Sequence, residues 1–164
     1  MTELIPIVNN QDKIIEYKER SLVQKEDIYR VSAMWIINSK CEILLARRAL
    51  TKTHGPGNWG PAVAGTVAYG ETYTKNIIKE AFEEIGLKNI KPIKGPKYRI
   101  SNENNFFTQW FFLKIDKDIT YFKIDKMEVD SIKWVNRKEL LEAIKKNPSK
   151  FSPNMKKYVK EFSK

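Results

Sequence analysis

Residues 65–87 read GTVAYGETYTKNIIKEAFEEIGL, and this stretch decides the fold. At about 100° per residue, a helix through it would gather on one side the acids Glu80, Glu83 and Glu84. The opposite side of the same helix would carry the apolar residues Ile77, Ile78, Ala81 and Ile85. Thr72 is a suitable N-cap and Gly86 a natural C-terminal stop, so the sequence predicts an amphipathic helix between them.

The three neighbouring carboxylates on this helix repel one another. Like charges at i,i+4 cost a helix about 0.2–0.5 kcal/mol per pair. A divalent cation reverses this effect, because Mg²⁺ and Mn²⁺ prefer hard oxygen ligands. A solvated acidic face on a surface helix gives the same spacing, so the acids alone do not decide between a metal site and a plain surface.

The complete stretch resembles the Nudix box, G-x5-E-x7-R-E-U-x-E-E-x-G-U, in which U is an apolar residue. Its fixed positions are matched here by Gly65, Glu71, Glu80, Ala81, Glu83, Glu84, Gly86 and Leu87. Six fixed Gly and Glu identities arise by chance about once in ten million starts, so the motif favours the metal site. Lys79 stands where the family has Arg, and it keeps the charge but lacks the planar fork. If this residue orients the Glu71 carboxylate, we expect Lys79 to hold that carboxylate less firmly than an Arg would.

The resemblance implies an α/β protein, a Nudix-type α/β/α sandwich with a mixed β-sheet. It also implies a metal-dependent hydrolase that cleaves a diphosphate linkage in a nucleoside diphosphate-type or related small substrate. The implied cofactor is Mg²⁺ or Mn²⁺. Its implied ligands are Glu80, Glu83 and Glu84, and a backbone carbonyl near Gly65 could complete the shell.

The same resemblance implies the catalytic acids. Glu83 and Glu84 belong to the metal helix, and Glu71 could orient the loop or the attacking water. The family often has a further acid downstream, on a loop near the site, that acts as ligand or general base. Glu128 is the first candidate for it and Asp130 the second, although a plain exposed loop acid is the alternative for each.

The segment before the box narrows the resemblance. Residues 43–60, ILLARRALTKTHGPGNWG, resemble the Nudix branch that includes isopentenyl diphosphate isomerase and its hydrolase-like relatives. In that isomerase, an Arg and a Lys of an R-A-L-S-K segment bind the substrate diphosphate. Arg48 and Lys52 match them here, so we expect Arg48 to grip phosphate through its fork and Lys52 to act as a point charge.

Two absences argue against the isomerase itself. The isomerase uses a Cys just before the first Gly of the box, where this chain has Ala64. Its metal-binding histidines have no counterparts at Tyr29 or Thr66, and the only histidine, His54, is expected to be exposed in a Gly/Pro-rich loop. An isomerase-like enzyme and a non-catalytic nucleotide- or RNA-binding module remain the alternatives to the hydrolase.

The length and composition fit an ordinary globular enzyme. The chain has 164 residues, 41% of them hydrophobic, so we expect one Nudix domain over residues 1–164. No basic leader and no apolar run of about 20 residues are visible, so we expect no membrane span and a cytoplasmic location. Cys41 is the single cysteine, which excludes an intramolecular disulfide and fits a reducing compartment.

The net charge of +10 favours anionic partners. Part of the excess lies in the C-terminal third, in Lys145, Lys146, Lys150, Lys156, Lys157, Lys160 and Lys164. A solvated lysine-rich face explains this pattern, and no RNA-binding aromatic motif stands out. Nucleic acid is therefore a lesser alternative to a small-molecule diphosphate, and a homodimer is one expected assembly because dimers are common in the family.

Alternating and apolar runs predict the remaining elements. We expect strands over residues 12–19, 30–37, 41–46, 62–67, 97–101, 106–115 and 129–135, with a hairpin between the second and third. We expect helices over residues 137–146 and from Ser152 and Pro153 to the C-terminus.

Overall fold

The structure is a computed structural model that describes residues 3–102 and 104–162. Within these residues, seven strands form one mixed sheet: β3 (Tyr29–Ile37), β4 (Ile43–Arg48), β5 (Trp59–Pro61), β6 (Val63–Thr66), β7 (Ile93–Ser101), β8 (Asn105–Lys114) and β9 (Val129–Val135). The helices are α1 (Tyr73–Ile85), α2 (Arg137–Lys146) and α3 (Met155–Phe162). Short 3₁₀ turns span Arg20–Leu22, Ile119–Tyr121 and Pro148–Lys150.

Strand β3 is the centre of the sheet. The main order is β5-β4-β3-β8-β7, while β6 also pairs with β3 and β9 with β4. The β3–β8 pair is parallel, from Tyr29 opposite Phe106 to Ile37 opposite Lys114, and the other pairs are antiparallel. Much of β3 is buried on both faces, which explains its nearly continuous apolar sequence.

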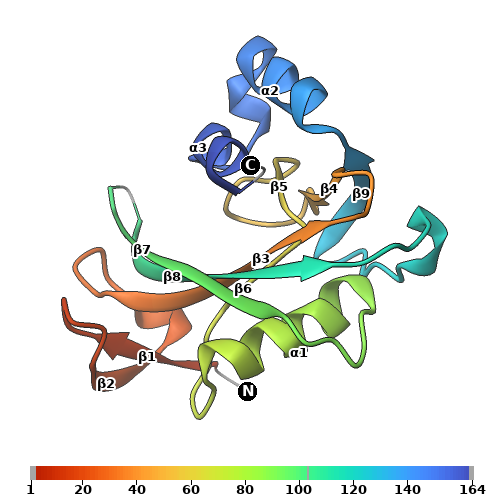
Figure 1. Ribbon diagram of the computed structural model, residues 1–164. Coiled ribbons are helices and arrows are strands. Elements are labelled where there is room, and N and C mark those ends of the chain that lie inside the picture. Colours follow the sequence, from red (N-terminus) through yellow and green to blue (C-terminus); the bar gives the residue numbers. More distant parts are fainter. Residues whose placement is uncertain (1–2, 103, 163–164) are drawn as a thin grey trace.

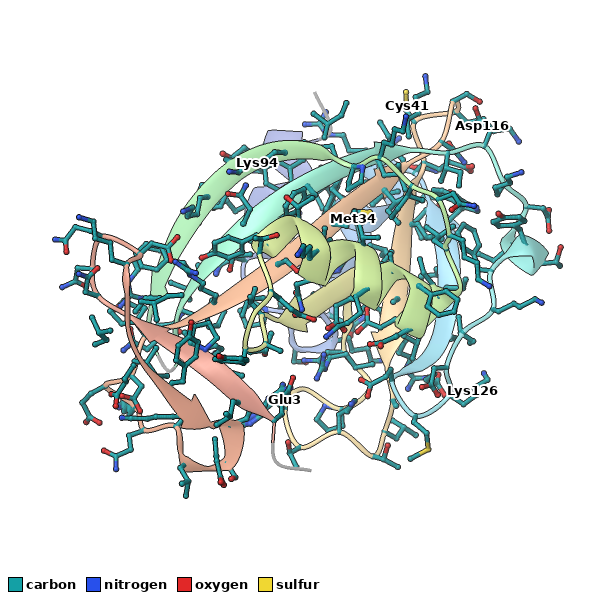
Figure 2. All side chains as sticks on the ribbon, turned by 90° about the horizontal axis from the view of Figure 1, so that it is seen from below. Glu3, Met34, Cys41, Lys94, Asp116 and Lys126 are labelled. Atoms are coloured by element: carbon teal, nitrogen blue, oxygen red, sulfur yellow. The ribbon has the colours of Figure 1, made fainter. Side chains whose placement is uncertain are left out.

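Helices cover both faces of the sheet. Figure 1 shows α1 below the sheet and α2 and α3 above it. Neighbouring residues of β3 serve opposite layers, because successive strand side chains alternate between faces. Figure 2 shows Met34 beside α1, and Met34 belongs to the buried cluster that includes Ile77 and Ala81. Trp35 belongs to the cluster of the opposite face, where its ring centroid lies 5.6 Å from that of Phe162 of α3. The expected α/β/α sandwich with a mixed sheet is thus confirmed.

Helix α1 begins and ends as predicted, but its buried side differs from the prediction. The Thr72 hydroxyl accepts a hydrogen bond from the Lys75 amide at 3.2 Å, and Gly86 takes a left-handed φ of 73°. The prediction that the acids lie opposite the apolar side is wrong for Glu84, which is only 8% exposed, and Ile78 is 37% exposed. At 100° per residue, Glu84 falls close to Ile77 on the sheet-facing stripe.

A separate antiparallel hairpin precedes the main sheet. It consists of β1 (Leu4–Val8) and β2 (Ile14–Glu19), where the sequence predicts only one strand over residues 12–19. Asp12 lies at its turn with a positive φ of 59°. The Asp12 carboxylate accepts hydrogen bonds from Arg30 Nε at 2.7 Å and from the Tyr73 hydroxyl at 3.1 Å. These contacts fasten the hairpin to β3 and α1.

Several other predictions differ from the structure in detail. The strand predicted over residues 62–67 is present as β6, whereas β5 was not predicted and lies at the end of the predicted Gly/Pro-rich loop. β6 pairs with β3, and β5 pairs with β4. The predicted hairpin of β3 and β4 pairs only at Ile37 and Ile43, because β4 continues between β5 and β9. β9 and α2 have the predicted bounds.

Within the part of the chain that the structure describes, no helix is long and apolar enough to cross a membrane.

Candidate active site

The Glu84 carboxylate lies in the interior between α1 and the sheet. Its Oε2 accepts a hydrogen bond from the Ala64 amide at 3.2 Å, and it has no ion-pair partner among the described residues. Burial raises the pKa of Glu84 to about 8, and the nearby Glu80 and Glu128 carboxylates add to this, whereas Arg48 opposes it. These effects show that the fold brings four of the predicted site residues, from three segments, into one electrostatic neighbourhood.

Glu80 lies one helical turn before Glu84 and directly over Gly65. Burial raises its pKa, although Lys79 opposes the shift from 3.3 Å. Asn76 Nδ2 donates to Glu80 Oε1 at 3.2 Å. A Cβ on Gly65 would overlap Cδ of Glu80, so any other residue there would displace this carboxylate. The glycine of the motif therefore lets the Glu80 carboxylate lie against the backbone of β6.

Glu71 is held in place by three donors. Its carboxylate accepts hydrogen bonds from the Ala68 amide at 3.0 Å and from Asn76 Nδ2 at 2.8 Å, and Lys79 Nζ lies 2.9 Å from Oε1. Burial alone would raise the pKa of Glu71, but these donors outweigh burial and lower it. Lys79 therefore forms an ion pair with Glu71 from the position where the family has Arg.

The predicted diphosphate-binding residues lie beside the acids. Arg48 ends β4, and its Nε donates to the His54 carbonyl at 3.0 Å. Lys52 in the following loop forms an ion pair with Glu128. The Ala49 amide also donates to the Glu128 carbonyl at 3.0 Å, which fixes this loop to the segment before β9. The loop after β4 and the segment before β9 thus bring the basic residue Lys52 and the acid Glu128 to the site together.

Two predicted acids lie apart from this group. Glu83 is exposed on α1, and its charge acts on Glu80. Asp130, the second candidate for the downstream acid, lies 3.4 Å from Arg47 instead. The carboxylates are not preassembled, since no set of three His, Cys, Asp or Glu side chains within residues 3–102 and 104–162 converges as a metal cage.

The donor chemistry nevertheless fits a divalent cation. The carboxylates of Glu80 and Glu84 are two possible oxygen ligands one helical turn apart, and burial raises the pKa of both. A cation between them would offset that repulsion and desolvation. The structure favours Glu80, Glu84 and the nearby Glu128 as the residues that would hold it, with Glu83 further out.

A cleft beside these residues has no counterpart in the sequence analysis. Its volume is about 400 Å³, and its wall includes Tyr29, His54 and Thr66. His54 is exposed, as expected, but it also borders this cleft. The lining comes from segments far apart in the chain, so no local spacing in the sequence signals it.

Comparison with known proteins agrees with this arrangement. The sequence matches the family model of the NUDIX domain over residues 28–162. The chain belongs to the Nudix family. It is 27% identical to the isopentenyl-diphosphate Delta-isomerase of Enterobacter sp. (strain 638), with 93% of this chain and 87% of that protein covered. It is 28% identical to a prenyl-diphosphate phosphatase of Methanosarcina mazei, with 93% and 91% covered.

A solved structure shows the same Nudix fold. The protein DR0079 from Deinococcus radiodurans superposes with a TM-score of 0.84 at 20% identity, covering 97% of this chain and 98% of that chain. The expected Nudix assignment is confirmed, and so is the expected enzyme class, the Nudix pyrophosphohydrolases.

Proposed function

We propose that this Nudix protein is a Mg²⁺- or Mn²⁺-dependent hydrolase that cleaves the diphosphate linkage of a small substrate. One observation carries the proposal: the buried Glu84 carboxylate lies near Glu80 and Glu128 and beside the cationic Arg48. A buried acid with a raised pKa and no ion pair within the described residues destabilises the fold, and such perturbed acids are typical of functional sites. A diphosphate site needs an acidic half that binds the cation, here Glu80 and Glu84, and a basic half whose cationic side chains bind phosphate, here Arg48 and Lys52.

The substrate would be held by the basic half. Arg48 uses Nε to bind the His54 carbonyl, which orients the guanidinium and leaves its terminal nitrogens for phosphate oxygens. Lys52 is paired with Glu128, and a diphosphate would compete for its ammonium group. Release of Lys52 would leave the Glu128 carboxylate free to accept a proton from water. This supports Glu128 as the general base or an additional ligand.

The acidic half would hold the cation. Glu80 and Glu84 are its proposed ligands, the Gly65 carbonyl is a further proposed ligand, and Glu83 is a proposed outer acid. Bound there, a divalent cation neutralises phosphate oxygens and favours attack by water. Glu71 orients this half from outside through Asn76, whose amide also donates to Glu80.

The isomerase names among the relatives make isomerisation the second candidate. Ala64 argues against it, because a methyl group stands where that reaction needs a thiol. In this structure Ala64 instead presents its amide to Glu84, which serves the acidic cluster. We expect no conversion of isopentenyl diphosphate to its allylic isomer.

The first test is product release with Mg²⁺ across a substrate panel. The panel contains nucleoside di- and triphosphates, ADP-ribose, dinucleoside polyphosphates, and isopentenyl and dimethylallyl diphosphates. We expect hydrolysis of at least one diphosphate, and we expect Glu84→Gln to lower kcat about a hundredfold or more while the fold is retained. Circular dichroism and thermal unfolding check the fold.

Two results would contradict this proposal. Near-normal turnover in Glu84→Gln would remove the metal-helix argument. No hydrolysis of any substrate in the panel, together with tight nucleotide binding, would favour the non-catalytic module. The exposed Glu142→Gln variant, on helix α2, is the matched control for loss of one carboxylate.

Three broader expectations stay predictions. A single domain over residues 1–164, a cytoplasmic location and a homodimer are compatible with the fold, and size-exclusion chromatography with light scattering would test the dimer. Nucleic acid remains the lesser alternative partner, supported only by the overall positive charge.

A further inference from the structure

We propose that Asn76 is a positioning residue that compensates for the departure from the motif at Lys79. Together with Lys79, it holds the carboxylates of Glu71 and Glu80 in a fixed arrangement. This inference rests on the proposed function, and it concerns a position that the Nudix box leaves open, because Asn76 falls within the x7 stretch. It is carried by the burial of Asn76, by its hydrogen bonds and by the acids that it shares with Lys79.

Asn76 is a fully buried polar residue on the sheet-facing side of α1, with an exposed fraction of 0%. Other inward positions of the helix hold Ile77 and Ala81, which belong to the buried apolar cluster. Asparagine is a weaker helix former than these residues, and its amide is costly to bury without hydrogen-bond partners. Helix formation and apolar packing therefore do not account for Asn76, whereas its hydrogen bonds do.

The amide nitrogen of Asn76 is shared by three acceptors. Nδ2 donates to the Thr66 carbonyl at 3.0 Å, to Glu71 Oε2 at 2.8 Å and to Glu80 Oε1 at 3.2 Å. A side-chain amide has two hydrogens, so these acceptors compete for them. One NH₂ group therefore bridges the carboxylate from the loop before α1 and the carboxylate on the helix, and it ties both to β6.

Ser32 fixes the orientation of this amide. The Ser32 hydroxyl donates to Asn76 Oδ1 from the central strand β3, where Ser32 is also fully buried. A flipped amide would place Oδ1 against the Thr66 carbonyl, and both of these oxygens are acceptors. Ser32 stands opposite Gly65 in the β3–β6 pair. The network thus runs from the centre of the sheet through α1 to both acids.

Lys79 contacts the same two acids. Its Nζ lies 2.9 Å from Glu71 Oε1 and 3.3 Å from Glu80 Oε1. The planar fork of an arginine can give each carboxylate its own N–H, whereas a lysine presents one nitrogen to both. Asn76 adds a second nitrogen, and it binds Oε2 of Glu71 while Lys79 binds Oε1. The Glu71 carboxylate is therefore held at both oxygens despite the missing fork.

This arrangement has a consequence for metal binding. A carboxylate that is already oriented loses less conformational freedom when it binds a cation, and loss of an outer hydrogen-bonding residue commonly weakens metal binding about ten- to a hundredfold. Glu80, a proposed ligand, is oriented in this way by Asn76 and Lys79. Removal of the Asn76 amide should therefore weaken metal binding, and Lys79→Arg should restore part of the loss.

The test is a double-variant cycle with Asn76→Ala, Lys79→Arg and their combination. The probe is Mn²⁺ alone, and electron paramagnetic resonance of the free ion gives its Kd without turnover. We expect Asn76→Ala to weaken Mn²⁺ binding about tenfold and Ser32→Ala about threefold. Lys79→Arg should change Kd by less than about threefold in the wild type, but it should restore about fivefold in Asn76→Ala.

Hydrolysis of the substrate that the panel identifies gives the second readout. At saturating Mg²⁺, Asn76→Ala should lower kcat about tenfold with little change in KM, because Asn76 contacts the acidic half and not the phosphate-binding side chains. Asn38→Ala is the matched control. Asn38 is 8% exposed and donates from Nδ2 to Glu42 at 2.7 Å, in the turn between β3 and β4. Thermal unfolding checks the fold of every variant.

The outcomes separate this inference from the proposed function. The role of Asn76 is overturned, while hydrolysis stands, by an unchanged Mn²⁺ Kd in Asn76→Ala, by an equal loss in Asn38→Ala, or by a loss that Lys79→Arg does not restore. If Asn76→Ala does not fold, Ser32→Ala with and without Lys79→Arg decides by the same criteria. If the panel shows no hydrolysis, the proposed function fails and the Mn²⁺ cycle alone decides the role of Asn76. No Mn²⁺ binding by the wild type would contradict both proposals.

Discussion

The two faces of the sheet are buried to a similar degree but by different chemistry. Under α2 and α3, aromatic rings fill the layer, with the Trp110 centroid 4.5 Å from Tyr158 and 5.0 Å from Phe162. Under α1, buried polar groups interrupt the apolar layer, among them Asn76 and Glu84. The first face therefore stabilises the fold, whereas the second gives up stability to place acids beside a basic loop.

The largest expected effect breaks the stabilising face. Trp110→Ala should lower the free energy of unfolding by about 3–5 kcal/mol, because a large buried ring is lost from the aromatic cluster. Urea unfolding followed by circular dichroism measures this. Phe82→Ala, on the exposed side of α1, is the control and should cost far less. A loss as small as that of the control would show that the α2–α3 layer does not dominate stability.

The next effect concerns the cost of the buried acid on the α1 face. The folded-state pKa of Glu84, about 8, exceeds its ordinary value, so the folded protein holds a proton that the unfolded chain releases. Between about pH 4.5 and 8, stability in EDTA should therefore fall as pH rises, with a slope of up to about 1.4 kcal/mol per pH unit from this group.

Unfolding of the wild type and Glu84→Gln across this pH range tests the assignment. The wild-type curve should fall more steeply than that of the variant, and Mg²⁺ should reduce the difference because it stabilises the charged acid. Parallel curves in EDTA would show that Glu84 carries no such cost.

A smaller effect concerns the basic side of the same site. Arg48→Ala should raise KM for the diphosphate substrate about tenfold with a modest change in kcat, because the guanidinium binds phosphate in ground and transition states alike. Steady-state kinetics at constant ionic strength measure it. Arg137→Ala, at the start of α2, controls for loss of positive charge. An unchanged KM in Arg48→Ala would remove the diphosphate-binding assignment.

The smallest effect concerns the departure from the family motif. Lys79→Arg should change kcat by less than about threefold, because Lys79 already pairs with Glu71 at 2.9 Å and that acid has two further donors. Lys79→Met should lower kcat more than Lys79→Arg, since it removes the cation. A strong gain of activity in Lys79→Arg would show that the lysine holds Glu71 too loosely.

The sequence predicted correctly those elements whose periodicity and capping residues agree with their environment in the folded protein. β9 and α2 have the predicted bounds, and α1 has the predicted caps, because periodicity and capping are local properties. The prediction missed β1, a strand of five residues that pairs with β2. It also placed Glu84 on the solvent side, because the spacing of the acids does not say which part of a helix the sheet will cover.

The same division applies to the site. The sequence alone determined the Nudix family, the acidic helix and the basic R-A-L-T-K segment, since each is a run of residues with fixed spacing. Only the tertiary structure decided that Glu84 is buried, that Glu128 and not Asp130 lies near it, and that Tyr29 and Thr66 border a polar cleft. Burial and proximity between distant segments depend on how strands pair and layers pack, and no local spacing encodes them.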